Sequence, residues 1–283
     1  MRLLRYGPAG GEKPGLVDDD GRIRDLSGHI DDIDPAFLAS KRMKSLADVE
    51  PASLPLVEGS PRLGVPLSGI GKIVAVGLNY IDHVKETGAK MPDEPTLFTK
   101  ATTALNGPND PIMLPKGSTH ADWEVELAVI IGNTAQYVDE EEALDHVFGY
   151  AVMNDVSERD FQKNRGGQWV KGKSCDTFAP LGPWLVTKDE VPDPQNLKLR
   201  LELNGVRRQD DNTSSMMRPV GFLIGYISRF MTLMPGDVVI TGTPSGVGMG
   251  CDPPEFLKPG DVLSLSVEGL GEQRQEVIAW KAG

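Results

Sequence analysis

Apolar and polar residues alternate along residues 123–131, and one set of alternate positions changes character partway. The odd-numbered positions are apolar throughout: Trp123, Val125, Leu127, Val129 and Ile131. The even-numbered positions begin with Glu124 and Glu126 and continue with Ala128 and Ile130. Because alternate side chains of a strand share a face, the pattern predicts a strand over 124–131 that is buried on both faces and carries two carboxylates at its start.

Apolar runs elsewhere predict a chain rich in β-strands. We expect a hairpin over 13–28 and strands over 72–80, 124–131, 148–154, 182–187, 197–203, 237–241, 262–267 and 275–280. Helices are expected over 35–47, 140–147 and 218–232, the last with an apolar stripe at Phe222, Leu223, Tyr226, Ile227 and Phe230. The 32 glycines and 22 prolines favour many short strands over a helical bundle. The predicted fold class is therefore β-rich α+β.

A proline-rich stretch divides the chain. Residues 48–71 hold four prolines and show no sustained periodicity, which is typical of a linker. We therefore predict a small N-terminal α+β domain with its linker over 1–70 and a main domain over 71–283.

Composition and charge narrow the choice of partners and compartment. The net charge of −12 repels phosphate backbones and anionic lipids, so we expect neither nucleic acid nor membrane as a partner. Apolar runs fall short of a membrane helix, and the first residues do not read as a signal peptide. Cys175 and Cys251 lack CxxC spacing and are expected to be buried thiols in a reducing compartment. These features favour a cytoplasmic protein.

Three carboxylates are candidates for a metal site. Asp155 follows the expected strand 148–154, so it can converge with Glu124 and Glu126. An alternating acidic strand in general is more often a solvated edge, but Ala128 and Ile130 on the acidic face weaken that alternative. Buried carboxylates need compensation, and oxygen ligands select a hard divalent cation such as Mg²⁺, Mn²⁺ or Ca²⁺. His120 is close in sequence and is a weaker candidate ligand.

A histidine and a glutamate three residues apart suggest a general base. His83 and Glu86 lie in NYIDHVKETG, residues 79–88, and would share a face of one helical turn. A carboxylate that orients an imidazole makes a base that works near neutral pH. Taken alone, an ordinary exposed helical pair is the more common interpretation.

Two further segments suggest binding of an anion. Residues 154–183 form a basic island in an acidic chain, and it contains Arg159, Gln162 and Lys173. Such an island suits an anionic substrate beside a metal, although Lys163 and Arg165 are equally well explained as solvated charges. The glycine-rich turn TGTPSGVG, residues 241–248, offers backbone N–H groups and Thr243 to an oxyanion or a carboxylate. It lacks the lysine of a P-loop.

Five motifs in order give the chain a resemblance to the fumarylacetoacetate hydrolase family. They are NYIDHVKE, EVELAVIIG, VMNDVSERDFQ, GKSCDTFAPLGPW and ITGTPSGVG, within residues 79–248. The resemblance implies a mixed β-sandwich roll and a homodimer. It places metal ligands at Glu124, Glu126 and Asp155, a catalytic dyad at His83 and Glu86, a catalytic lysine at Lys173, and substrate contacts at Arg159, Gln162 and Thr243. It also places Thr177 near the metal.

The resemblance also implies a reaction. A metal-dependent hydrolase of this type cleaves a carbon–carbon bond in a 2,4-dioxo acid, either an acylpyruvate or a 2,4-diketo-3-deoxy sugar acid, and releases pyruvate. Mg²⁺ or Mn²⁺ is the expected cofactor and a small anionic 2-oxo acid the expected substrate. Decarboxylation, isomerisation and ureidoglycolate cleavage use related enolate-type chemistry and remain alternatives, as does an inactive metal-binding relative.

Overall fold

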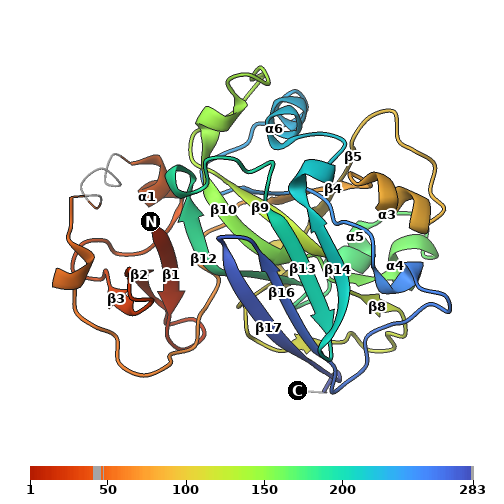
Figure 1. Ribbon diagram of the computed structural model, residues 1–283, viewed down its shortest axis with the longest axis horizontal. Helices are drawn as coiled ribbons and strands as arrows, with labels where there is room; N and C mark the ends of the chain where they lie inside the picture. The colour runs from red at the N-terminus through yellow and green to blue at the C-terminus, as the bar shows by residue number, and fades with distance from the viewer. Residues whose placement is uncertain (41–45, 47, 282–283) are drawn as a thin grey trace.

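The computed structural model of the chain describes residues 1–40, 46 and 48–281. Strands dominate and the helices are few and short, which confirms the expected β-rich α+β class. Two sheets carry the architecture, and together at one end of them (Figure 1) lie the helices α3 (Ile81–Glu86), α4 (Arg159–Lys163) and α5 (Val170–Lys173). No helix within the described residues is long and apolar enough to cross a membrane.

The larger sheet runs through both the N-terminal segment and the main part of the chain. Its order is β3 (Ile23–Asp25), β2 (Lys13–Val17), β1 (Arg2–Tyr6), β12 (Ala179–Thr187), β10 (Val147–Asn154), β9 (Val125–Ile131), β15 (Val238–Ile240), β4 (Ile73–Gly77) and β5 (Thr96–Lys100). Neighbours along this path are antiparallel except β15 and β4, and β6 (Leu105–Asn106) adds a parallel bridge to β12. Because β1 pairs with β12, the N-terminal hairpin extends the central sheet.

The smaller sheet covers one face of the larger one. Its order is β14 (Val206–Asn212), β13 (Lys198–Leu203), β16 (Val262–Val267), β17 (Gly271–Ile278) and β7 (Ile112–Met113). β13 and β16 contact β9, and β17 contacts β12. A two-stranded ribbon of β8 (Ala121–Asp122) and β11 (Ser157–Glu158) lies off both sheets.

Strand β9 lies between two hydrophobic cores, as its alternation predicts. The odd-numbered residues from Trp123 to Ile131 belong to the core shared with the smaller sheet. Ala128 and Ile130 belong to a second core, to which the N-terminal segment contributes Leu3 and Leu26. The N-terminal segment thus covers the part of the acidic face that carries Ala128 and Ile130. Its described residues do not cover the part that carries Glu124 and Glu126.

Helices are short, and those nearest the acidic face lie at the end opposite the N-terminal hairpin. They are α1 (Pro35–Ala39), α3 (Ile81–Glu86), α4 (Arg159–Lys163), α5 (Val170–Lys173) and α6 (Val220–Ser228). The 3₁₀ turns are η1 (Pro51–Ser53), η2 (Thr102–Ala104), η3 (Ala143–His146), η4 (Lys188–Glu190), η5 (Thr213–Ser215) and η6 (Gly248–Gly250). Figure 1 shows α3, α4 and α5 on the side away from β1–β3.

Several expected elements differ from the observed ones. The expected helix 140–147 is only the 3₁₀ turn η3, because Val147 already pairs with Ile131 in the β10–β9 ladder. The helix expected over 35–47 is five residues long within the described part, and residues 41–45 and 47 lie outside it. Sequence analysis missed β1, β5 and β14. β14 reads VRRQDDN, and as a polar edge strand it lacks apolar alternation.

The stripe on α6 is half core and half surface. Leu223 and Ile227 are fully buried in the core. The three aromatic rings form a row instead, with Phe222 and Tyr226 stacked 5.9 Å apart and Phe230 set edge-on to Tyr226 at 5.0 Å. Phe230 is 62% exposed. The stripe therefore contributes Leu223 and Ile227 to the core, and its three aromatic rings lie toward the surface.

Candidate active site

The β9–β10 ladder brings the three carboxylates together. Glu126 lies in β9 opposite Met153 of β10, and Glu124 and Asp155 lie where the two strands diverge. The Asp155 N–H donates to the Glu124 carbonyl at 2.8 Å. One oxygen from each of Glu124, Glu126 and Asp155 lies within 4.8 Å of the others, and all three residues are buried. The solvated-edge alternative is therefore wrong for these acids.

Three buried cations contact two of these carboxylates. Lys173 Nζ lies 2.7 Å from Glu124 Oε2 and 2.5 Å from Asp155 Oδ2. Arg159 Nη1 contacts Glu124 Oε1 at 2.7 Å, and Lys100 Nζ contacts Asp155 Oδ1 at 2.5 Å. Lys100 is a functional candidate that sequence analysis missed. It is one lysine at the end of an ordinary-looking strand, and nothing in its local sequence distinguishes it.

Glu126 differs from its two neighbours. Its Oε2 accepts the Gly242 N–H at 2.7 Å, and no described lysine, arginine or histidine lies within 4.0 Å of its carboxylate. Burial and the charges of Asp155 and Glu124 raise the pKa of Glu126 well above its usual value. Burial would also raise the pKa of Glu124, but Lys173 and Arg159 outweigh it and lower that pKa. No cation among the described residues contacts Glu126 directly, so the ionised form of Glu126 is less well compensated than that of Glu124.

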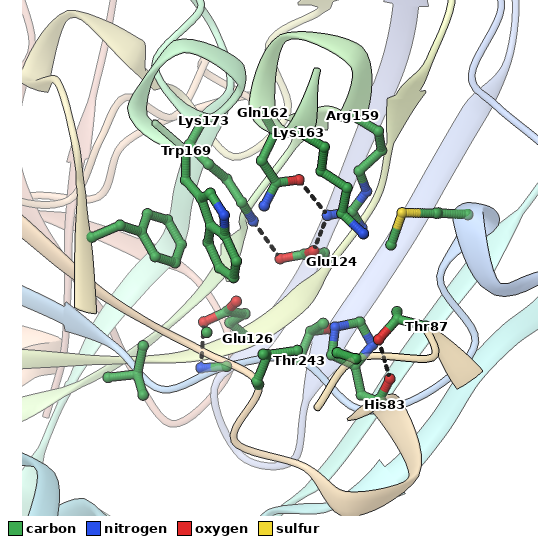
Figure 2. A pocket seen from close by; sticks show the side chains of 17 residues that line it. His83, Thr87, Glu124, Glu126, Arg159, Gln162, Lys163, Trp169, Lys173 and Thr243 are labelled. Carbon is green, nitrogen blue, oxygen red and sulfur yellow. Dashed lines mark hydrogen bonds and ion pairs between the residues drawn. The ribbon is translucent and has the colours of Figure 1, made fainter. Parts of the chain in front are cut away.

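The carboxylates open into a pocket with an aromatic wall. The cavity holds about 70 Å³ and is partly open to solvent, and both Glu124 and Glu126 line it, whereas Asp155 does not line it and contacts Lys173. Phe98 and Trp169 both line the cavity, with ring centroids 5.2 Å apart, and Figure 2 shows Trp169. A Cβ at Gly77 would lie 2.4 Å from the Trp169 ring, so glycine is required there for the wall to form.

The His83–Glu86 pair is formed and faces this pocket. Helix α3 positions both residues, and His83 Nδ1 lies 2.8 Å from Glu86 Oε1. Glu86 Oε2 accepts the Gly246 N–H at 2.8 Å, which fixes the carboxylate from its other side. His83 is buried and lines the cavity across from Trp169 and Lys173 (Figure 2). The ordinary exposed pair is therefore the wrong interpretation.

The glycine-rich turn binds carboxylates, but they belong to the protein itself. Besides the N–H groups of Gly242 and Gly246, those of Gly248 and Met249 donate to Asp122 at 2.7 and 3.1 Å. The Thr243 hydroxyl donates to the Val125 carbonyl at 2.9 Å and accepts from Gln209. Thr243 lines the pocket, yet in this arrangement it has no hydroxyl proton for an anionic ligand.

Arg159 keeps one donor unused. Its Nε donates to Asp122 at 2.8 Å and its Nη1 to Gln162 Oε1 at 3.2 Å. Nη2 is buried and has no hydrogen-bond partner among the described residues. An orphaned guanidinium N–H costs free energy unless a ligand satisfies it. Asp122, which continues the acidic alternation of Glu124 and Glu126, was missed as the residue that orients Arg159.

Four other candidates lie elsewhere or differ from expectation. Thr177 does not line the pocket, and its hydroxyl accepts the Met113 N–H at 2.8 Å; its expected place near the metal stays a prediction. His120 contacts the Thr119 hydroxyl at an exposed position and is not part of the acidic cluster. Cys175 and Cys251 are free but only half-buried, which corrects the expectation of buried thiols.

Comparison with known proteins identifies the family whose members this chain resembles. Residues 72–278 match the model of the fumarylacetoacetate hydrolase C-terminal domain. A 2,4-didehydro-3-deoxy-L-rhamnonate hydrolase from a Sphingomonas species is 56% identical over 99% of this chain and 97% of its own. The solved fumarylacetoacetate hydrolase of Exiguobacterium antarcticum is 37% identical over 99% of this chain and all of its own, with a TM-score of 0.89.

A third relative was solved with ligands. The maleylpyruvate hydrolase of a Sphingobium species, in complex with manganese and pyruvate, is 30% identical over 99% of this chain and all of its own, with a TM-score of 0.84. The chain therefore belongs to the fumarylacetoacetate hydrolase family and is an enzyme that acts on carbon–carbon bonds. The buried acidic triad and the manganese in this relative indicate a divalent metal.

Proposed function

We propose that this member of the fumarylacetoacetate hydrolase family hydrolyses the C3–C4 bond of a 2,4-dioxo acid and releases pyruvate. The observation that carries the proposal is the oriented His83–Glu86 pair, which faces the carboxylates across one pocket. The Sphingomonas relative, named as a hydrolase of a 2,4-didehydro-3-deoxy sugar acid, favours a sugar acid over a simple acylpyruvate.

The residues fit a divalent cation as cofactor. Glu124, Glu126 and Asp155 offer three closely spaced oxygens, and Glu126, which no described cation contacts directly, is less well compensated than Glu124. Oxygen ligands favour Mg²⁺ or Mn²⁺, and Ca²⁺ is also compatible with them. When bound, the ion would supply Lewis-acid stabilisation of negative charge on the oxygens of the 2-oxo acid.

His83 is the proposed base. Glu86 accepts a hydrogen bond from Nδ1, which leaves Nε2 as the nitrogen able to take a proton from water. The resulting hydroxide adds to the C4 carbonyl of the substrate. The second contact of Glu86, with the Gly246 N–H, holds the pair in place through the reaction.

Arg159 and Lys173 are placed to hold the charge that develops. The free Nη2 of Arg159 is a donor for an oxyanion or a carboxylate, and Lys173 lines the same cavity with Gln162 beside it. When the C4 oxyanion collapses, the C3–C4 bond breaks. Its electron pair becomes the enolate of pyruvate, C4 becomes a carboxylic acid, and the proton on His83 returns to C3.

A substrate screen tests the proposal. Metal-stripped protein with added Mg²⁺ or Mn²⁺ is incubated with acylpyruvates, 2,4-dioxo sugar acids, oxaloacetate and ureidoglycolate, and products are followed by proton NMR. We expect pyruvate and a second acid from the 2,4-dioxo compounds. Carbon dioxide from oxaloacetate alone, or a keto–enol shift without cleavage, would replace hydrolysis by decarboxylation or isomerisation. No turnover of any compound would favour an inactive relative.

We also propose that the enzyme is a cytoplasmic homodimer. The exposed ring of Phe230, two residues after the end of α6, offers apolar surface for a second copy. Light scattering at micromolar protein concentration is expected to give twice the chain mass of 30.6 kDa. A monomer mass at that concentration would contradict the proposal.

A further inference from the structure

The mouth of the pocket carries a cation that differs from the others lining it. Arg159 and Lys173 are buried and ion-paired, and His83 is paired with Glu86. Lys163, at the end of α4, is exposed and forms no ion pair or hydrogen bond among the residues that the structure describes. Sequence analysis explained Lys163 as a solvated charge, and the structure adds that Lys163 lines the pocket.

The position of Lys163 suits contact with the part of a substrate beyond its reacting carbon. In Figure 2 its side chain extends into the cavity from the same helix as Arg159 and Gln162, opposite His83 and Thr87. If a dioxo acid lay with its oxo-acid end at the carboxylates and C4 at His83, the chain from C5 onward would continue past the buried lining residues toward the exposed side of the pocket, where Lys163 lies.

Among the other partly exposed lining residues, Trp169 carries an indole N–H and three others offer little polar recognition. Ala89 and Met249 are apolar, and the Thr87 hydroxyl is bonded to the carbonyls of His83 and Val84. An ammonium group has three donors on a flexible stem and can follow an acceptor over some distance.

We infer that Lys163 selects substrates by donating a hydrogen bond to an oxygen on the tail beyond C4. This inference rests on the proposed function, because it assumes that the 2-oxo acid end lies at the carboxylates. The oxygen can belong to a hydroxyl group, as in a sugar acid, or to a second carboxylate. An unsubstituted alkyl tail would leave Lys163 without a partner.

Matched substrates separate this role from a general electrostatic effect. The wild-type enzyme, Lys163→Met and the control Lys171→Met are compared on 2,4-dioxohexanoate, 5-hydroxy-2,4-dioxohexanoate and 2,4-dioxoheptanedioate. Lys171 is exposed and binds the Arg165 carbonyl on the same segment, away from the pocket lining. We expect Lys163→Met to lower the ratio of kcat/KM for an oxygen-bearing tail over the alkyl tail by about tenfold or more, because a hydrogen bond from a charged donor is lost.

The outcomes are distinct. A lower ratio for the hydroxy acid alone identifies a hydroxyl tail, and a lower ratio for the diacid alone identifies a carboxylate. Equal losses on all three substrates, or none, would overturn the inference, as would the same change in Lys171→Met.

A binding measurement separates the inference from the proposed function. Affinities of the three acids are measured by calorimetry in the His83→Ala background with Mn²⁺, where turnover is not needed. If the wild-type enzyme cleaves none of them, the hydrolase proposal fails. The inference still stands if Lys163→Met weakens binding of an oxygen-bearing acid relative to the alkyl acid, and it fails if all three affinities change together.

Discussion

Two groups of buried charges in this protein can be compared directly. One is the candidate active site with Glu124, Glu126 and Asp155. The other is the Asp18 cluster, which consists of Asp18 and Arg24 in the N-terminal hairpin, both nearly inaccessible at 6% and 7% exposure. In that cluster Arg24 Nε contacts Asp18 Oδ2 at 2.7 Å, and Oδ1 accepts the N–H groups of Asp20 and Arg22.

The two clusters differ in how many of their buried charged groups lack a partner. Arg24 also donates to the Leu54 carbonyl at 3.1 Å, so both charged side chains of the Asp18 cluster have partners within the protein. Burial would raise the pKa of Asp18, but the hydrogen bonds and charges of Arg22 and Arg24 lower it to about 2. In the candidate active site, Glu126 lacks a cation and Arg159 Nη2 lacks an acceptor among the described residues. Buried charged groups whose partners all lie within the protein have a structural role, whereas buried groups without such partners are available to ligands.

The largest effect is expected from Glu126→Gln. The substitution keeps the size of the side chain and removes the charge that the metal would compensate. We expect no measurable turnover at ordinary Mg²⁺ concentrations. Loss of a residue that only hydrogen-bonds to a metal ligand lowers metal affinity by about 10–100-fold. Because Glu126 is a proposed ligand itself, its substitution should lower metal affinity by more than that. Activity assays and calorimetric titration with Mg²⁺ measure the two.

Asp18→Asn is the matched control for that experiment, because it also removes one buried carboxylate charge. It should leave Mg²⁺ affinity and kcat near the wild-type values. An unchanged Mg²⁺ affinity in Glu126→Gln, or an equal loss in both variants, would remove the distinction between the two charge clusters.

The His83–Glu86 pair gives the next effect in size. Removal of a well-placed general base costs about 10²–10⁴-fold in rate, so His83→Ala should lower kcat for cleavage by that factor and leave metal affinity intact. Glu86→Ala should lower kcat nearly as much, and the double variant should show no further loss, because the two residues act as one unit. The measurement is kcat for the three variants on one cleaved substrate.

Full activity in His83→Ala would exclude this pair from the reaction. Additive losses in the double variant would show instead that Glu86 acts separately, for example by holding the Gly246 turn in place.

The smallest effect is expected in the stability of Asp18→Asn. Because folding lowers the pKa of Asp18 from an ordinary value near 3.8 to about 2, its charge stabilises the fold above pH 4, and this contribution is lost as pH falls toward 2. The variant should therefore unfold at a lower temperature than wild type at pH 7, and the gap should narrow at pH 3. Thermal unfolding followed by circular dichroism measures the gap, and a gap that widens on acidification would contradict this account.

The sequence predicted most of the site because its chemistry is carried by short-range patterns. The alternation from Trp123 to Ile131 placed Glu124 and Glu126 on one face of a strand buried on both sides, and the spacing of His83 and Glu86 placed them on one helical turn. The division of residues 1–70 from 71–283 remains a prediction, with β1 paired to β12 across the proposed boundary.

Tertiary structure decided which groups are compensated and which are free. Lys100 reaches Asp155 from 55 residues away, and the N–H groups of the turn 241–248 are occupied by the protein's own carboxylates. The physical reason is that local sequence fixes the face on which a side chain lies, by the two-residue period of a strand or the turn of a helix. Compensation of a buried charge depends instead on atoms within a few ångströms, and in this protein a strand, two short helices and a turn that are distant in the chain supply those atoms.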